Sequence, residues 1–175
     1  MALTVEDGSG LATADALVSL AFCDTYHTDR GNTAWTGLDA DKEGAIRRAS
    51  FFLSNSYAWE GRRVKGRNQA LAWPRAGVSD AEGLGILSTE VPTEVQQACA
   101  EAALRELVTV GALTPDYTPS ERQSSVKAGP VSVTFDLSRK DADAVRPVML
   151  IVRDLIGPFL AGGNSMLAGE AVRAG

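Results

Sequence analysis

The sequence of 175 residues has few of the side chains on which active sites and metal centres are usually built. It contains one histidine, His27, which excludes a pair of histidine ligands and leaves general bases scarce. Its two cysteines, Cys23 and Cys99, have no CxxC spacing and lie in apolar, helix-like surroundings, which predicts buried free thiols. There is no Gly-x-Ser-x-Gly elbow, no P-loop and no carboxylate cluster with metal-ligand spacing. We therefore expect neither an enzyme nor a cofactor.

Long apolar runs are missing as well. No stretch approaches the roughly 20 apolar residues that a bilayer-spanning helix requires. The first residues, Met1–Asp7, lack the basic and apolar regions of a signal peptide. We expect a protein that has no contact with a membrane and is made or assembled in the cytoplasm. Its 45% hydrophobic and 22% charged residues are ordinary for a globular chain, and one domain is the default expectation.

Charge is unevenly distributed along the chain. Residues 1–44 carry 8 acids and 2 bases, whereas residues 45–75 carry 1 acid and 7 bases. Residues 76–175 carry 13 acids and 8 bases, so the net charge of −5 conceals blocks of −6, +6 and −5. A chain with a pI near 4.9 is not expected to coat nucleic acid over its whole surface. The positive block could contact nucleic acid locally, or pair with an acidic block of a neighbouring copy.

The first stretch with helical apolar spacing begins at Leu20, after a capping Ser19. Gly31 and Asn32 end it. His27 falls near its C-terminus, where a polar surface histidine is expected. The preceding segment from Thr13 to Ser19 is expected to be extended.

Two longer helices are predicted next. One starts from a cap at Asp39 or Asp41 and ends near Tyr57. The other opens at Pro92, with Thr93 as a cap candidate, and runs to the neighbourhood of Gly111. Residues 76–91 between them are rich in Gly, Ser and Asp and are expected to form a loop.

The C-terminal third predicts a hairpin and a last helix. Apolar and polar residues alternate around the turn Gly129-Pro130, which places a hairpin near residues 126–136. A last helix is expected to start within residues 143–147. The predicted fold class is mainly α: a small helical bundle with one β-hairpin in a domain of residues 1–160, followed by an extended C-terminal arm of residues 161–175.

The segment from Trp59 to Arg75 is dense in arginine and tryptophan and is the strongest functional candidate. In one interpretation its cations neutralise phosphates while a tryptophan stacks on bases. In the other, which we favour, the tryptophans are core or interface anchors and the cations bind carboxylates of the same or an adjacent chain. The candidate interface residues are Trp59, Arg62, Arg63, Lys65, Arg67, Trp73 and Arg75.

A set of motifs in residues 1–113 is distinctive as a group: Tyr26-His27, Arg30-Gly31-Asn32, Trp35, Ala45–Leu53, Tyr57, Trp59–Arg63, Gln69–Val78, Val91-Pro92 and Val95. Together these motifs resemble a family of tailed-bacteriophage head–tail connector (neck adaptor) proteins, often labelled DnaT-like single-stranded DNA-binding proteins. The run Gln69-Ala70-Leu71-Ala72-Trp73-Pro74-Arg75 is the most distinctive of them. It is not a catalytic motif.

The resemblance implies a structural virion protein of the neck. It would form a ring, commonly of twelve copies, between the portal protein and a downstream neck or tail-completion protein, and DNA would pass through the channel without sequence-specific binding. Under this interpretation the C-terminal arm docks on the portal or a neighbouring subunit, with Gly162, Gly163, Met166, Leu167 and Val172 as candidate contacts. The alternative is a replication accessory protein that binds single-stranded DNA through Arg62–Arg75.

Overall fold

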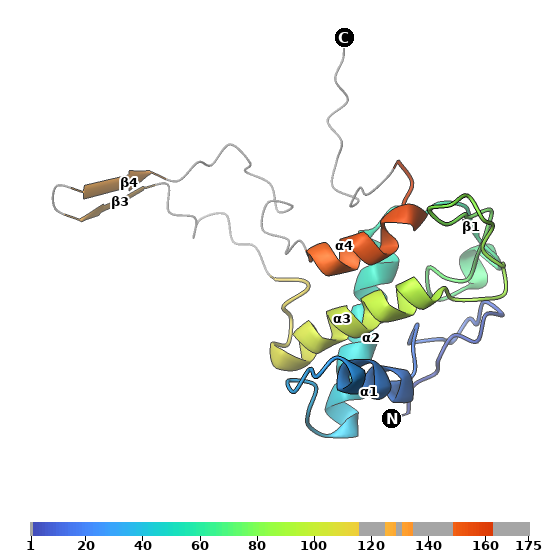
Figure 1. Cartoon of the computed structure of the whole chain (residues 1–175), viewed down its shortest axis with the longest axis horizontal. Helices are drawn as coiled ribbons and strands as arrows, with labels where there is room; N and C mark the ends of the chain where they lie inside the picture. Colours follow the sequence, from blue (N-terminus) through green and yellow to red (C-terminus); the bar gives the residue numbers. More distant parts are fainter. Residues whose placement is uncertain (1, 116–124, 129–130, 135–148, 163–175) are drawn as a thin grey trace, which may run out of the picture.

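Four α-helices and two small antiparallel sheets make up the protein, as the computed structural model shows for residues 2–115, 125–128, 131–134 and 149–162 (Figure 1). The mainly α fold class with one hairpin is confirmed. In chain order the elements are α1 (Leu20–Asp29), α2 (Asp39–Ser56), β1 (Arg62–Arg63), the 3₁₀ helix η1 (Gly66–Asn68), β2 (Arg75–Ala76), α3 (Thr93–Val108), β3 (Ser125–Ala128), β4 (Val131–Thr134), α4 (Leu150–Ile156) and the 3₁₀ helix η4 (Gly157–Phe159).

Helices α2 and α3 cross at the centre, and α1 and α4 pack against α3 (Figure 1). The α2–α3 contact is lined by small residues without any solvent exposure, among them Ala45 and Ala49 on α2 and Ala98 and Ala102 on α3. Because such side chains add little bulk, the two helix backbones can approach closely. The remaining volume is filled by larger apolar side chains, which form one continuous core.

The helix starts were predicted with mixed success. Ser19 caps α1 as expected, since its Oγ accepts a hydrogen bond from the Phe22 N–H at 3.1 Å. The predicted cap of α2 was wrong, because Leu38 occupies the cap position and Asp39 and Asp41 lie inside the first turn. There the two acids act on the positive end of the helix dipole without capping an N–H. The predicted cap Thr93 is likewise the first residue of α3, after Pro92.

The hairpin prediction is confirmed, because β3 and β4 pair with Ser125 opposite Thr134 and Ala128 opposite Val131. The last helix is present as α4, whereas its predicted start within residues 143–147 lies outside the described residues. The predicted C-terminal arm beyond Gly162 also lies outside them.

A chain of aromatic rings joins α2 to the C-terminal helices. Trp59 and Trp73 meet edge to face at 5.7 Å between ring centroids, and Trp73 meets Phe159 at the same distance. Tyr57 extends the chain to Phe52 on α2. The sequence around Trp59 and Trp73 therefore ties the irregular segment after α2 to the helical core.

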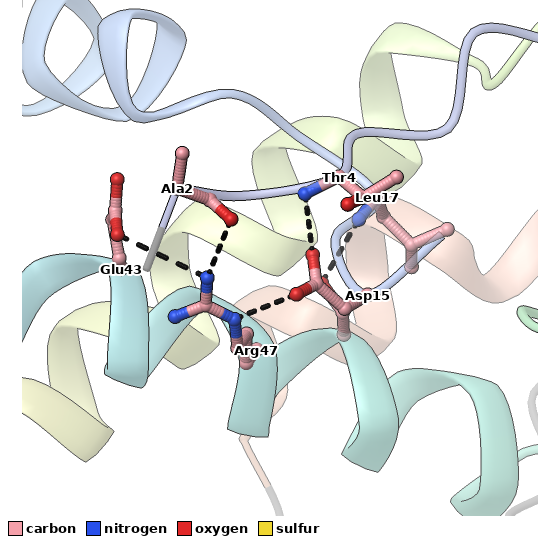
Figure 2. Close-up of polar contacts among 7 residues, drawn as sticks. Ala2, Thr4, Asp15, Leu17, Glu43 and Arg47 are labelled. Atoms are coloured by element: carbon pink, nitrogen blue, oxygen red, sulfur yellow. Dashed lines mark hydrogen bonds and ion pairs between the residues drawn. The ribbon is translucent and has the colours of Figure 1, made fainter. Parts of the chain in front are cut away.

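The N-terminal segment is held on α2 by Arg47 (Figure 2). The Arg47 guanidinium donates to Asp15 Oδ2 at 2.7 Å and to the Ala2 carbonyl at 3.0 Å, and Glu43 lies 3.9 Å away. Asp15 in turn accepts from the Thr4 N–H at 2.8 Å. One arginine thus connects the first residues of the chain, the extended segment around Asp15 and α2.

His27 is buried, and the prediction of a surface histidine was wrong. Its Nε2 lies 3.1 Å from the Ala100 carbonyl and its Nδ1 lies 3.0 Å from the Asn32 amide nitrogen, so Nε2 donates and Nδ1 accepts. Trp35 covers the ring at 4.6 Å between centroids. Burial lowers the pKa of His27 below its ordinary value, which keeps the ring neutral.

Glu106 is a buried carboxylate that closes the C-terminal end of α3. It accepts from Arg48 Nε at 2.7 Å, from the Gly111 N–H at 3.0 Å and from the Leu113 N–H at 2.9 Å. Burial alone would raise the pKa of Glu106, but these donors outweigh it and hold the pKa below its usual value.

We expect Glu106→Gln to destabilise the protein by about 2 kcal/mol at neutral pH, because it weakens three hydrogen bonds to a buried charge. A carboxylate whose pKa is lower in the folded state stabilises the fold above its unfolded pKa, and this contribution is lost as the pH falls through the folded value. The difference between wild type and variant should therefore shrink below about pH 4.5. Urea unfolding across a pH series measures it, with the exposed Glu94→Gln as control. A difference that does not change with pH would contradict the assignment.

Candidate functional site

Four of the seven bases of the positive block lie in a short loop that follows α2. We call residues 62–67 the cation loop, because they carry Arg62, Arg63, Lys65 and Arg67. The loop begins in β1, which pairs with β2 through Arg62 opposite Ala76, and it ends in η1. Figure 1 shows it at the end of the molecule where α2 ends and α3 begins.

Three cations of the loop are exposed to solvent. Within the part of the chain that the structure describes, the side chains of Arg62, Lys65 and Arg67 make no ion pair and no hydrogen bond. Arg63 is half-buried and donates to the Gln69 carbonyl at 3.4 Å. The loop therefore presents three positive charges to solvent on six residues, a local excess that favours an anionic partner.

Gln69 holds the cation loop from beneath. Its buried side-chain amide donates to the carbonyls of Leu71 and Pro74, each at 3.0 Å, and accepts from the Lys65 N–H at 3.3 Å. One amide therefore ties three backbone positions together. The sequence does not mark Gln69 as a functional residue, because nothing local distinguishes a buried glutamine from an exposed one.

The N-terminal segment supports the same loop. Glu6 is buried and accepts from the N–H groups of Gly8, Gly10 and Leu11 at 3.0, 2.8 and 2.9 Å. The Leu11 carbonyl then accepts from the Ala70 N–H at 3.1 Å. Gly10 has a φ of +78°, and a Cβ there would lie 2.8 Å from Lys65 Cγ, so glycine permits the contact. In the sequence, the Gly8-Ser9-Gly10 run that follows Glu6 and Asp7 is the signal for such a turn around a carboxylate.

Arg75 differs from the other arginines because it is buried. Its guanidinium donates to the carbonyls of Glu60, Ala72, Trp59 and Gly61, the last at 2.8 Å. Burial, with a contribution from Arg63, lowers the pKa of Arg75 below its ordinary value, yet an arginine stays charged in a protein. Arg75 thus holds the base of the cation loop and does not face an external partner.

The two tryptophans of the segment also lie in the core. Trp59 is 8% exposed and Trp73 is fully buried, and Trp59 Nε1 donates to the Leu53 carbonyl at 3.1 Å. Both tryptophans therefore act as core anchors. Neither offers a ring face on which a base could stack. Of the seven candidate residues, the structure brings Arg62, Lys65 and Arg67 together on one surface, half-buries Arg63, and places Trp59, Trp73 and Arg75 behind it.

The other candidates add little to the site. Gly162 is exposed with a φ of +77°, whereas Gly163, Met166, Leu167 and Val172 lie outside the described residues. No group of His, Cys, Asp and Glu side chains in the described ranges could hold a metal ion. Over the same ranges, none of the helices is long and apolar enough to cross a membrane.

The fold and the site define a small, mainly α protein with an exposed cation loop whose base is held by buried hydrogen bonds. Residues 1–174 match the family described as "Putative DnaT-like ssDNA binding protein", and the chain belongs to that family. No curated protein and no solved structure matches the chain. The family description concerns single-stranded DNA and contains no reference to a virion neck.

Proposed function

We propose that this protein binds single-stranded DNA through phosphate contacts made by Arg62, Lys65 and Arg67. The observation that carries the proposal is a short, internally braced loop with three exposed cations that have no partner among the described residues. The family to which the chain belongs supports a nucleic-acid ligand. Because the remainder of the chain is acidic, contact is confined to this loop.

The mode of binding follows from what surrounds the cations. Trp59 and Trp73 are buried, so base stacking of the kind that many single-strand binders use is not available to them. Phosphate contacts alone carry no sequence information. The complex should therefore be weak, indifferent to sequence and sensitive to salt. Each phosphate neutralised on a single strand adds about 0.7 to the salt slope, so three contacts predict a slope of about −2.

The test is the affinity for a short oligothymidine, measured by fluorescence anisotropy over a salt series. The combined variant Arg62→Gln, Lys65→Gln and Arg67→Gln should lose about 100-fold in affinity at low salt, because it removes every unpaired cation of the loop. Its salt slope should fall towards zero. Arg30→Gln is the matched control: Arg30 is also exposed, but it lies at the end of α1 and stacks over Tyr26.

Two results would overturn the proposal. One is an affinity and salt slope that the triple variant shares with wild type. The other is wild-type protein without measurable binding at low salt. Tryptophan emission gives a second readout, because saturating DNA should leave it nearly unchanged while all three tryptophans stay buried. Strong quenching would indicate that bases stack on a tryptophan, which contradicts binding through phosphate contacts alone.

A second candidate is the head–tail connector, favoured by the separation of charge along α2. The exposed acids Asp39 and Asp41 lie in its first turn, and the cation loop follows its last turn. The helix between them has 18 residues and is therefore about 27 Å long. Opposite charges at opposite ends suit a heterologous contact, in which one face of a subunit meets a different face of the next. In this candidate a ring of copies joins the portal to a downstream neck protein.

The two candidates differ in what the triple glutamine variant should lose. A DNA-binding protein loses affinity for the oligonucleotide and keeps its mass in solution. If the protein is a connector, the variant loses ring assembly, whatever its affinity for DNA. Averaged images of purified assemblies or of virion necks would show this loss. An intact ring in the variant would exclude the cation loop as the ring contact.

A further inference from the structure

A turn of residues 6–11, which we call the N-terminal turn, packs between the cation loop and the segment that precedes α3. Its backbone touches the loop directly, since a Cβ at Gly10 would lie 2.8 Å from Lys65 Cγ. On the other side, a Cβ at Gly8 would overlap the Thr89 carbonyl. Figure 1 shows the N-terminal segment, in blue, reaching the side of the body where β1 lies. The turn therefore has close neighbours on both sides.

Glu6 gives the N-terminal turn its shape. Its Oε1 accepts from the N–H groups of Gly8 and Gly10 at 3.0 and 2.8 Å, and its Oε2 accepts from the Leu11 N–H at 2.9 Å. The side chain is only 5% exposed, and over the described ranges no cationic side chain pairs with it. Hydrogen bonds to an ionised acceptor are about twice as strong as neutral ones, so the turn depends on this carboxylate.

Two contacts connect the N-terminal turn to the backbone of the cation loop. The Leu11 carbonyl accepts from the Ala70 N–H at 3.1 Å, which fixes the chain just after η1. A Cβ at Gly10 would lie 3.0 Å from Gln69 Oε1, the same oxygen that accepts from the Lys65 N–H at 3.3 Å. The conformation of the loop at Lys65 therefore depends on the shape of the turn.

We propose that Glu6 is a positioning residue for DNA binding: its carboxylate holds the N-terminal turn, and the turn holds the cation loop in the conformation that contacts phosphates. The inference rests on the proposed DNA binding and adds to it a residue that cannot contact phosphate itself, since both are anionic. It also predicts an effect whose sign is opposite to that of charge alone. Removing a negative charge beside a cationic site strengthens the attraction for an anion, whereas loosening the loop weakens binding.

The first pair of variants separates position from charge. In Glu6→Gln, glutamine keeps one acceptor oxygen and has an NH₂ group in place of the other, so one side of the group no longer accepts an N–H. Asp7→Asn is the matched control, because it removes the same charge from the next residue, which is exposed. Asp7 Oδ1 accepts from the Ser9 N–H at 2.9 Å, and asparagine retains that acceptor.

The second pair of variants changes no charge. Gly10→Ala places a Cβ against Lys65 and strains a backbone with a φ of +78°. Gly31→Ala is its matched control, because Gly31 also has a positive φ, of +65°, but a Cβ there meets nothing within 4 Å. Far-UV circular dichroism and a urea midpoint show that each variant folds. If Glu6→Gln does not fold, Gly10→Ala decides by the same criteria.

The measurement is the affinity for a short oligothymidine over a salt series, with the full chain. Glu6→Gln and Gly10→Ala should each bind about fivefold more weakly than wild type, as expected when only about a fifth of the molecules hold the loop in its binding conformation. Their salt slope should stay at about −2, because all three exposed cations of the loop remain. Gly31→Ala should bind like wild type, and Asp7→Asn should bind at least as tightly.

Hydrogen exchange followed by mass spectrometry gives a second readout that needs no DNA. Residues 62–70 should exchange faster in Glu6→Gln and Gly10→Ala than in wild type, while α1 exchanges at the same rate in all of them. Three results would overturn this inference and leave DNA binding intact: Glu6→Gln that binds as tightly as wild type, Glu6→Gln with a salt slope near zero, or unchanged exchange of the loop. Wild type that does not bind DNA would overturn both proposals.

Discussion

Trp73→Ala is expected to destabilise the protein by about 4 kcal/mol, which is a large share of the stability of a small domain. Trp73 is fully buried and contacts both Trp59 and Phe159 edge to face. Alanine would leave a cavity between the segment after α2 and the C-terminal helices, which the surrounding structure can close only in part. Guanidinium unfolding followed by circular dichroism measures the loss.

Two further variants make this prediction specific. Trp73 Nε1 has no hydrogen-bond partner among the described residues, so Trp73→Phe loses packing area but no hydrogen bond. It should cost about 1–2 kcal/mol, at most half of the alanine effect. Phe51→Ala, at an exposed aromatic of α2, should change stability by no more than about 0.5 kcal/mol. If Trp73→Ala were as stable as Phe51→Ala, the assignment of Trp73 to the core would be wrong.

Arg75→Gln is expected to cost about 3–5 kcal/mol, because a single guanidinium satisfies four backbone carbonyls at the base of the cation loop. Glutamine is too short and has too few donors to reach them all. Lysine at position 75 keeps the charge but lacks the planar fork, so Arg75→Lys should recover less than half of the loss. Urea unfolding at neutral pH measures both variants.

Arg62→Gln is the control for this prediction, since Arg62 lies on the neighbouring β1 and is exposed, with no side-chain partner in the described ranges. It should change stability by no more than about 0.5 kcal/mol and still weaken DNA binding. The two substitutions should therefore have different effects: Arg75→Gln lowers the stability of the fold, whereas Arg62→Gln lowers the affinity for DNA. Equal effects of both substitutions on stability would show that Arg75 does not brace the loop.

The helices could be predicted because their signals are local. The apolar spacing of α1, α2 and α3 repeats over several turns, and the ends carry Ser19, Pro92 and Gly111. The hairpin was predictable for the same reason, since alternation and a turn lie within a few residues of each other. Only the details of the α2 and α3 caps were wrong, where an acid or threonine took a place inside the helix.

Buried polar groups could not be predicted, because their partners are distant in the chain. His27 contacts a carbonyl of α3, Glu106 pairs with Arg48 of α2, and Glu6 fills a turn that packs on the cation loop. The sequence immediately around each of these residues is typical of an exposed position. Long-range pairing decides its burial.

The candidate site was located by its density of arginine and tryptophan, but the roles within it were not separable from the sequence. Arg62 and Arg75 are the same residue type in one segment, yet one is exposed and the other binds four carbonyls. What distinguishes them is the pairing of β1 with β2 and the burial of Trp73 next to Pro74, which draws Arg75 inward. These are properties of the folded chain.

The two cysteines have a practical consequence for labelling. Cys23 and Cys99 have no solvent exposure, and burial raises the pKa of both thiols, that of Cys99 to about 12. Alkylating reagents attack the thiolate, so the native protein should be almost inert to maleimides at neutral pH. A cysteine introduced at the exposed Arg67 would then be the reactive thiol of the described body. A fluorophore or cross-linker can therefore be placed on the cation loop without first replacing either native cysteine.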